Sequence, residues 1–264
     1  MNVLVTGAAS GIGKATVEYF LKRGHVVYAV DINECEKKDN LLSYVADITD
    51  EDSLTSVKES VASLGVKLDA IICIAGIHTM AALVESDYSR IKRVIDVNLL
   101  GTMLTCRTLH SLLSGSGRVV IVTSEVATYA PMPFNGLYNV SKTALDSYAD
   151  ALRQELNLLG QKVVVVRPGA IETPLAASSA TSTERLAADT VLYEKQAKHF
   201  SSLVRKFTGT PMCPCALAPL IYMAASKKRP RLAYSKNRNP GLVLLSILPK
   251  RAQCSIIKFL LSMK

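Results

Sequence analysis

The chain has 264 residues, of which 49% are hydrophobic and 20% charged, so it is long and apolar enough for one folded α/β domain, and this composition argues against disorder. The net charge is +9, but residues 226–264 hold ten Lys and Arg and no Asp or Glu. The other 21 bases and 22 acids nearly cancel, so the basic character belongs to this carboxyl-terminal tail.

Strand-like and helix-like segments alternate along the chain. Short runs rich in Val and Ile predict strands, and apolar residues at helical spacing predict helices. We expect strands at 3–6, 26–30, 41–45, 70–74, 118–123, 162–166 and 231–234, and helices at 12–23, 54–64, 89–113, 137–159, 187–203 and 216–225. Unbroken apolar strands are typical of parallel sheets that helices cover on both faces. We therefore predict a doubly wound parallel α/β sheet in a single domain, 1–264.

A glycine-rich turn, Thr6–Gly13, joins the first strand to the first helix. Glycines allow a backbone to approach a pyrophosphate closely, and the helix that follows offers free N–H donors to the phosphates. The spacing is G-x-x-x-G-x-G, and a plain strand-to-helix turn is the alternative reading. The strand–turn–helix context favours a dinucleotide site.

Asp31 ends the second strand, 18 residues after Gly13. A carboxylate there can accept hydrogen bonds from the adenosine ribose and would repel a 2′-phosphate. No base lies at residues 8–10, so the pattern favours NAD over NADP. Lys37 and Lys38 follow closely and keep NADP as an alternative.

The candidate catalytic residues are Ser124, Tyr138 and Lys142. Ser124 ends a predicted strand, and Tyr138 follows 14 residues later with Lys142 four residues beyond it on one helix face. A neighbouring ammonium should lower the pKa of the Tyr138 phenol from about 10, so that the phenol could exchange a proton with an alcohol or carbonyl. Ser124 could hold the same oxygen by a hydrogen bond.

Together these motifs resemble the short-chain dehydrogenase/reductase family, which has a Rossmann-type fold. The resemblance spans about residues 2–225 and includes Asp47-Ile48, Ala75-Gly76, Asn98 and the segment from Arg167 to Pro174. It implies that Asn98 joins the catalytic group by holding a water in a proton relay. It implies a cofactor site made of Gly7, Ser10, Gly11, Ile12, Gly13, Asp31, Ile32, Asp47, Ile48, Ala75, Gly76, Tyr138, Lys142, Pro168, Gly169, Ile171 and Thr173.

Two features depart from the family pattern. The usual Asn-Asn-Ala-Gly segment is Cys73-Ile74-Ala75-Gly76 here, which removes two amides associated with turn stability and cofactor support. The spacing from Ser124 to Tyr138 is one residue longer than the commonest one, which a loop around residues 131–133 can absorb.

The six cysteines are scattered and fit no zinc site, so we predict no metal. We expect all six to be reduced, including Cys213 and Cys215 of a C-x-C pair, because disulfides are rare inside cells. We also expect no signal peptide and no membrane span, and therefore a cytoplasmic protein.

Two segments bear on the substrate and partners. Residues 175–210 interrupt the alternation and predict a lid whose apolar side chains suit a hydrophobic alcohol or ketone, although they could equally pack the lid on the body. Residues 226–264 form the basic tail, with an apolar helical face at 256–261. Such segments lie on membranes, cover a lid or pack on another subunit.

The overall layout resembles hydroxysteroid and retinol dehydrogenases. This resemblance implies a steroid-like substrate, a class that includes anionic members such as bile acids, and a homodimer or homotetramer. The alternatives are a 3-oxoacyl reductase, which would be expected to use NADPH, and a nucleotide-sensing binding protein on the same fold. Nucleic-acid binding by the tail is disfavoured because its bases alternate with Leu and Ile rather than with aromatic residues.

Overall fold

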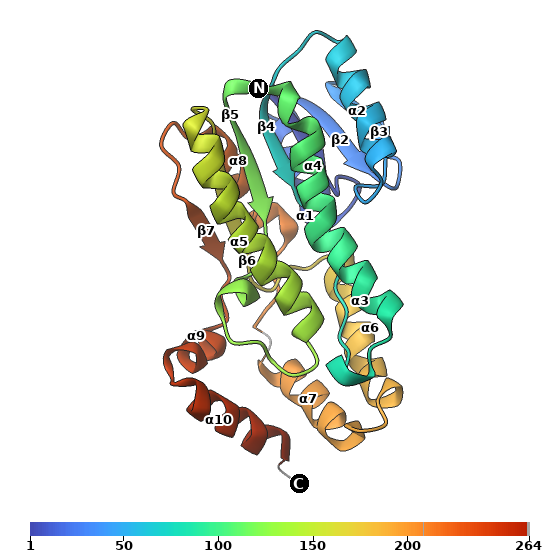
Figure 1. Cartoon of the computed structure of the whole chain (residues 1–264), viewed down its shortest axis with the longest axis vertical. Coiled ribbons are helices and arrows are strands. Elements are labelled where there is room, and N and C mark those ends of the chain that lie inside the picture. The colour runs from blue at the N-terminus through green and yellow to red at the C-terminus, as the bar shows by residue number, and fades with distance from the viewer. Residues whose placement is uncertain (208, 263–264) are drawn as a thin grey trace.

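A seven-stranded parallel sheet forms the centre of the protein in the computed structural model, which describes residues 1–207 and 209–262. The strand order is β3-β2-β1-β4-β5-β6-β7, and helices cover both faces (Figure 1). The strands are β1 (Asn2–Thr6), β2 (Val26–Asp31), β3 (Leu41–Val45), β4 (Leu68–Cys73), β5 (Leu113–Val122), β6 (Lys162–Pro168) and β7 (Ala233–Lys236). The predicted doubly wound parallel sheet is confirmed.

The α-helices are α1 (Gly11–Leu21), α2 (Glu51–Ser63), α3 (Tyr88–Ile95), α4 (Gly101–Leu109), α5 (Gly136–Leu158), α6 (Pro174–Asp189), α7 (Glu194–Phe207), α8 (Ala218–Ser226), α9 (Pro240–Ile247) and α10 (Lys250–Ser262). Short 3₁₀ segments are η1 (Leu83–Glu85), η3 (His110–Leu112), η4 (Glu125–Thr128) and η5 (Pro214–Ala216), and η2 (Asp96–Leu100) is a π-helical turn.

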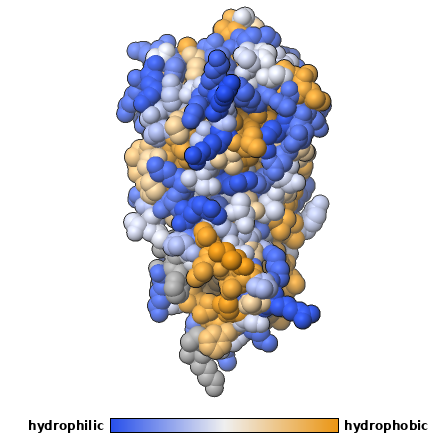
Figure 2. All heavy atoms as spheres, turned by 90° about the vertical axis from the view of Figure 1, so that its left-hand side faces the viewer, coloured by the Kyte–Doolittle hydropathy of each residue, from blue (hydrophilic) through white to orange (hydrophobic). Residues whose placement is uncertain are grey.

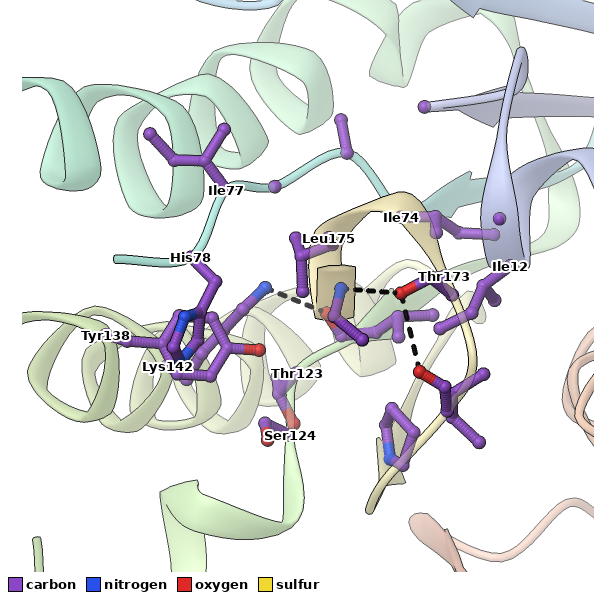
Figure 3. Close-up of a pocket in the computed structure, with 18 of the residues that line it drawn as sticks. Ile12, Ile74, Ile77, His78, Thr123, Ser124, Tyr138, Lys142, Thr173 and Leu175 are labelled. Carbon is purple, nitrogen blue, oxygen red and sulfur yellow. Dashed lines mark hydrogen bonds between the residues drawn. The ribbon is translucent and has the colours of Figure 1, made fainter. Parts of the chain in front are cut away.

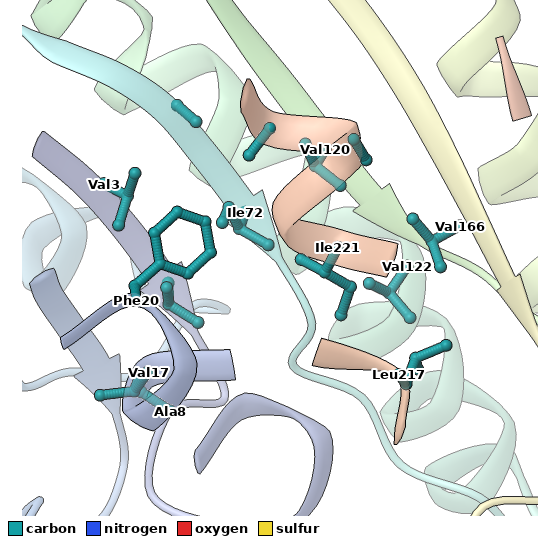
Figure 4. Close-up of a cluster of buried hydrophobic side chains, with 14 of the residues drawn as sticks. Val3, Ala8, Val17, Phe20, Ile72, Val120, Val122, Val166, Leu217 and Ile221 are labelled. Carbon is teal, nitrogen blue, oxygen red and sulfur yellow. The ribbon is translucent and has the colours of Figure 1, made fainter. Parts of the chain in front are cut away.

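Two apolar clusters bind the helices to the sheet. One lies under α1 and α8, where Phe20 and Ile221 pack on strand residues such as Val120 (Figure 4). The other lies under α2, α4 and α5 on the opposite face. Each central strand contributes alternate residues to the two clusters, so both of its faces are buried and its sequence is almost continuously apolar.

The predicted long helix at 89–113 is divided in the structure. The turn η2 separates α3 from α4, and β5 already begins at Leu113, five residues before the predicted start. Leu113 pairs with Leu68, and an irregularity in the register follows before Arg118 pairs with Ala70. The early start of β5 passes through the Ser-Gly-Ser-Gly run 114–117, which has no apolar periodicity to reveal a strand.

The helices α6, α7, α9 and α10 lie beyond the carboxyl end of the sheet, in the lower part of Figure 1. Two of them, α6 and α7, occupy the predicted lid at 175–210, where the sequence indicated a single helix at 187–203. The others, α9 and α10, form the last part of the basic tail. Residue 208 of the lid and residues 263 and 264 of the tail lie outside the described residues.

The expectation that all cysteines are reduced is wrong for one pair. Cys213 and Cys215 form a disulfide. A short turn over Pro214 brings their Cα atoms to 5.2 Å, within the usual disulfide range. Cys35, Cys73, Cys106 and Cys254 are free thiols. Among the described helices, none is both long and apolar enough to cross a membrane.

Candidate active site

A cavity of about 1170 Å³ opens where the central strands end. Every predicted site residue lines it except Asn98, which lies behind its wall. Parallel strands in a doubly wound sheet present their carboxyl ends at one edge, where ligands of such folds bind. The fold therefore gathers side chains that are far apart in the sequence (Figure 3).

The glycine-rich turn has no room for a side chain at Gly7 or Gly13, where it lies against neighbouring backbone. A Cβ on Gly13 would lie 1.8 Å from the carbonyl oxygen of Gly7, and a Cβ on Gly7 would lie 2.8 Å from the backbone of Ala75. Gly7 and Gly11 also have positive φ angles of 68° and 49°, which glycine adopts without strain. The turn leads into α1, whose N-cap Ser10 makes no side-chain cap, so its first N–H groups suit a phosphate. This cradle fits a dinucleotide.

Asp31 stands beside that turn at the end of β2. One carboxylate oxygen accepts a 3.0 Å hydrogen bond from the Ala9 N–H, and the other accepts from Asn33. The carboxylate thus fixes the turn and presents negative charge to the cavity. Lys38, which the sequence left as an alternative partner for a phosphate, pairs instead with Glu18 and Glu36.

Asp47 and Ile48 line the same half of the cavity. One Asp47 oxygen accepts hydrogen bonds from the backbone and hydroxyl of Thr49, each 2.8 Å long. Ile48 is buried against Gly101, where an added Cβ would come within 2.8 Å of its side chain. These contacts make a rigid wall at the end of the cavity nearest β3.

Ser124, Tyr138 and Lys142 meet at the other half of the cavity. All three are buried, with exposed fractions of 7%, 9% and 3%. Ser124 lies beside Tyr138 (Figure 3), and the Lys142 Nζ atom lies 5.8 Å from the centre of the Tyr138 ring. Lys142 donates a hydrogen bond, 3.4 Å long, to the carbonyl of Val122 at the end of β5 (Figure 3).

Burial controls the ionisation of this group. It raises the pKa of Tyr138 to about 12, which the hydrogen bond with Ser124 partly opposes, and it lowers the pKa of Lys142 to about 8. The prediction that Lys142 lowers the pKa of Tyr138 is therefore wrong for this arrangement. Removing the phenol from water disfavours the phenolate, and the cause that opposes this shift is Ser124 rather than the ammonium. Tyr138 is a protonated donor at neutral pH.

Asp146 holds the helix that carries Tyr138 and Lys142. It lies one turn after Lys142 on α5 and pairs with Arg167 of β6 at 2.6 Å and 2.9 Å. It also accepts a hydrogen bond of 3.1 Å from the hydroxyl of Thr123, the neighbour of Ser124. Asp146 therefore ties α5 to the ends of both strands that approach the candidate catalytic group.

Asn98 lies in the π-helical turn η2 and is completely buried. Its carbonyl oxygen accepts from the Ile77 N–H at 2.7 Å, and its amide nitrogen donates to the Ile77 carbonyl and to Ser141. Ser141 lies on α5, one residue before Lys142. Asn98 thus fixes the loop after β4 against α5, and its predicted role in holding a water stays a prediction.

The altered Cys73-Ile74 segment keeps its turn by other contacts. The backbone N–H groups of Ile74 and Ala75 both donate to the hydroxyl of Thr6, at 3.2 Å and 3.4 Å. Cys73 is buried with its sulfur 4.0 Å from that of Cys106. The Thr6 hydroxyl and the buried contact between Cys73 and Cys106 therefore hold this segment in place.

The segment after β6 closes the cavity from a second side. Thr173 caps α6 by accepting from the Ala176 N–H, and it lies where a Cβ on Gly11 would touch it. Ile171 forms a bridge with Met212 of the strand-like segment that precedes the disulfide. The chain after α7 thus supports the backbone of Ile171.

Two residues that line the cavity, His78 and Arg238, were not predicted from the sequence. His78 packs its ring 4.4 Å from that of Tyr138 and bonds Asn135 through Nε2, and burial lowers its pKa to about 4. Arg238 lines the cavity and donates from Nε to the Tyr129 hydroxyl at 2.7 Å. The only signal for His78 was its place in the loop that follows β4, and none marked Arg238, which comes from the tail.

Comparison with known proteins identifies the class. Residues 1–184 match the family described as short chain dehydrogenase, so the chain belongs to that family and the predicted membership is confirmed. The family comprises NAD(P)-dependent oxidoreductases that act on CH–OH groups. The finer likeness to hydroxysteroid and retinol dehydrogenases stays a prediction.

Individual relatives are distant. The probable oxidoreductase EphD of Mycobacterium tuberculosis is 29% identical over 243 residues, which are 86% of this chain but 40% of that protein. The NADPH-dependent 1-acyldihydroxyacetone phosphate reductase of Schizosaccharomyces pombe is 32% identical over 200 residues, which cover 72% and 67% of the two chains. The chain thus spans well under half of the first of these relatives.

Among solved structures, a 3-ketoacyl-(acyl-carrier-protein) reductase from Brucella melitensis complexed with NADH superposes with a TM-score of 0.73. Its sequence is 23% identical, and the match covers 90% of this chain and 98% of that one. At this identity the likeness concerns the fold alone.

Proposed function

We propose that the protein transfers a hydride between NAD and a hydrophobic secondary alcohol or ketone. The observation that carries the proposal is the meeting of Ser124, Tyr138 and Lys142 in one cavity with the glycine cradle. A bound nicotinamide supplies or accepts the hydride, and the chain itself must handle the proton and hold the reacting oxygen.

In this proposal Tyr138 is the proton donor in the direction of carbonyl reduction. Its pKa of about 12 keeps the proton on the phenol at neutral pH, and its hydroxyl faces the cavity beside Ser124. Ser124 holds the substrate oxygen by a hydrogen bond. Lys142 stabilises negative charge on Tyr138 once the proton has left, and the same steps reverse for alcohol oxidation.

Replacing Tyr138 by Phe tests this function. Tyr138→Phe should lower kcat by at least about a hundredfold, the lower range for general acid–base catalysis, and should leave NAD binding intact. NADH formation followed by absorbance gives the first quantity, and calorimetric titration with NAD gives the second. Unchanged turnover would remove this mechanism. NAD binding by a wild type that oxidises no alcohol would favour a nucleotide-sensing protein instead.

The preference for NAD rests on Asp31. Its carboxylate lines the cavity and would repel a 2′-phosphate, while Lys38 is paired with Glu18 and Glu36. Asp31→Asn keeps an oxygen for the Ala9 N–H but removes the charge. The ratio of kcat/KM for NAD to that for NADP should fall by about tenfold or more. A wild-type enzyme that prefers NADP would refute this assignment.

The half of the cavity beyond Tyr138 is mainly apolar. Met80, Leu175, Ala176, Val204 and Leu242 line it, so it suits a bulky hydrophobic substrate. A hydroxysteroid is the class that we favour. Steroid, retinoid, acyl and sugar alcohols offered with NAD distinguish the substrate classes, and turnover of sugar alcohols alone would reject a hydrophobic substrate.

A ketone that carries an acidic group is the second candidate, and Arg238 favours it. Its guanidinium lines the apolar half of the cavity and could pair with a carboxylate or phosphate. Bile acids, acyl chains on acidic carriers and lipid phosphates share this chemistry. Arg238→Gln should raise KM for an acidic steroid more than for its neutral alcohol, and equal effects on both would exclude this pairing.

We also propose a homodimer or homotetramer that pairs through α4 and α5. Leu100 at the end of η2, Met103 on α4 and Val140 on α5 are exposed apolar residues, with exposed fractions of 44%, 36% and 53%. Val140→Asp should shift the mass measured by light scattering toward the monomer. A wild-type protein that is already monomeric would reject this assembly.

A further inference from the structure

The helices α9 and α10 present large apolar side chains to the outside. Leu244 and Ile247 of α9 have exposed fractions of 68% and 74%, and Ile256 and Phe259 of α10 have 38% and 66%. We call these four residues the α9–α10 face. Figure 2, which views the molecule from the side of these helices, shows apolar side chains gathered in its lower half. Apolar residues that cluster in this way mark a surface that binds something.

This face is a defined structure rather than a loose end of the chain. Asn239 caps α9 by accepting from the N–H groups of Gly241 and Leu242. The buried side chain of Gln253 donates to the Leu248 carbonyl at 2.6 Å and fixes the turn between the two helices. Leu261 of α10 packs against the apolar cluster that includes Phe200 of α7.

The charged side chains in the segment that forms this face are all basic. Lys250, Arg251 and Lys258 are exposed on α10, and residues 226–264 contain no Asp or Glu. A second copy of the chain bound to the same face would bring like charges together, which disfavours association. Apolar side chains beside bases on paired short helices match instead the interfacial region of a membrane with anionic headgroups.

The face is also continuous with the cavity. Pro240 and Leu242 of α9 line the cavity, whereas Leu244 and Ile247 of the same helix point outward. The turn between α6 and α7 exposes Val191 and Leu192, with exposed fractions of 90% and 65%, at the same end of the molecule (Figure 1). The apolar half of the cavity therefore opens beside the exposed apolar side chains.

We propose that the α9–α10 face docks the protein on an anionic lipid surface, with the mouth of the cavity turned toward the membrane. The apolar side chains enter the headgroup boundary, and the bases pair with lipid phosphates. A lipid-soluble substrate would then reach the cavity without crossing bulk water. The docking itself depends only on the surface, so it stands or falls independently of the reaction that the cavity performs.

Vesicle sedimentation of the full chain tests this docking. The protein should pellet with vesicles of phosphatidylcholine and phosphatidylglycerol at low salt, and not with phosphatidylcholine alone. Each charge lost from Lys250 or Arg251 should weaken binding about fivefold, so Lys250→Glu/Arg251→Glu should weaken it by more than about 25-fold. Ile247→Asp/Phe259→Asp should abolish it, because charged side chains cannot enter the apolar boundary.

A matched control comes from Leu158, the last residue of α5, which is 86% exposed and is not part of the α9–α10 face. Leu158→Asp should bind vesicles like the wild type. Circular dichroism melts and light scattering of every variant separate loss of docking from unfolding. Equal binding by all variants, or no binding by the wild type, would overturn the proposal. A wild-type dimer that Ile247→Asp/Phe259→Asp converts to a monomer would overturn it too, because a second copy would then cover the face.

Discussion

The carboxylate of Glu125 accepts a hydrogen bond of 2.7 Å from the backbone N–H of Asn239, 114 residues away in the chain. Glu125 follows Ser124 directly, and Asn239 caps α9. The bond therefore joins the loop after β5 to the tail, whose residues complete the apolar half of the cavity. The tail is part of the wall of the candidate active site and not an appendage to it.

Glu125→Leu should loosen this wall. It removes the carboxylate that accepts from the Asn239 N–H, and the loss of such a bond costs about 1–3 kcal/mol of stability. KM for a bulky substrate should rise by a larger factor than the dissociation constant for NAD, because the bond joins the segment after β5 to α9, whereas the glycine cradle lies between β1 and α1. Steady-state kinetics and NAD titration check both values. Glu125→Gln keeps an acceptor oxygen and is the matched control; if it behaves like Glu125→Leu, the charge matters rather than the bond.

Replacing Asp146 should disturb the position of α5. Asp146→Ala leaves Arg167 without its carboxylate at a site where the Asp146 side chain is 13% exposed, and breaking such a pair costs about 3 kcal/mol. The free energy of unfolding in urea should fall by that amount. The value of kcat should fall as well, because Thr123 and α5 lose their shared anchor.

Asp150→Ala is the control for Asp146→Ala. Asp150 pairs with Arg153 on the same helix, but its side chain is 61% exposed. Removing an exposed pair should change stability by less than about 1 kcal/mol. If both variants were equally stable, the Asp146 pair would not anchor α5.

The residues that the sequence located correctly in the cavity come from strand ends and from one helix turn. Tyr138 and Lys142 are four residues apart, and Ser124 ends a strand, so local periodicity was enough to bring them to one edge of the sheet. The family pattern added Asp47, Ile171 and Thr173. Each of these positions depends on the chain nearby or on the fixed order of the sheet.

What the sequence did not reveal depends on contacts between distant segments. Arg238 enters the cavity because Glu125 and Tyr129 hold the segment before α9, which no spacing along the chain encodes. The pKa of Tyr138 was predicted in the wrong direction because a motif shows the neighbouring Lys142 but not the burial of the phenol. The disulfide between Cys213 and Cys215 was likewise not predicted, because its formation depends on the backbone geometry of the turn.

Gly13 offers a steric test of the cofactor cradle. The Cβ of Gly13→Ala would overlap the Gly7 carbonyl at 1.8 Å, so the turn must move. NAD should bind at least about tenfold more weakly, a loss of about 1.4 kcal/mol. Fluorescence titration measures the dissociation constant. Gly115→Ala meets open space and should bind NAD like the wild type. Tight binding by Gly13→Ala would mean that phosphates are held elsewhere.

His78 predicts how stability depends on pH. Burial, with a smaller contribution from the Lys142 ammonium, lowers its pKa to about 4, although the hydrogen bond to the Asn135 carbonyl oxygen opposes this shift. An unfolded histidine binds its proton near pH 6.5, so between pH 6.5 and pH 4 the unfolded chain holds a proton that the folded chain lacks. Stability should therefore fall as the pH falls through this range, by about 3 kcal/mol in total.

Urea unfolding of the wild type and of His78→Gln from pH 7 to pH 4.5 isolates this contribution. Other groups titrate in both proteins, so only the difference between their free energies of unfolding reports His78. As the pH is lowered, the wild type should lose more stability than the variant, because glutamine does not titrate. A difference that stays constant would show that His78 gains its proton at the same pH in the folded and unfolded chains. The ring would then be accessible to water despite its contact with Tyr138.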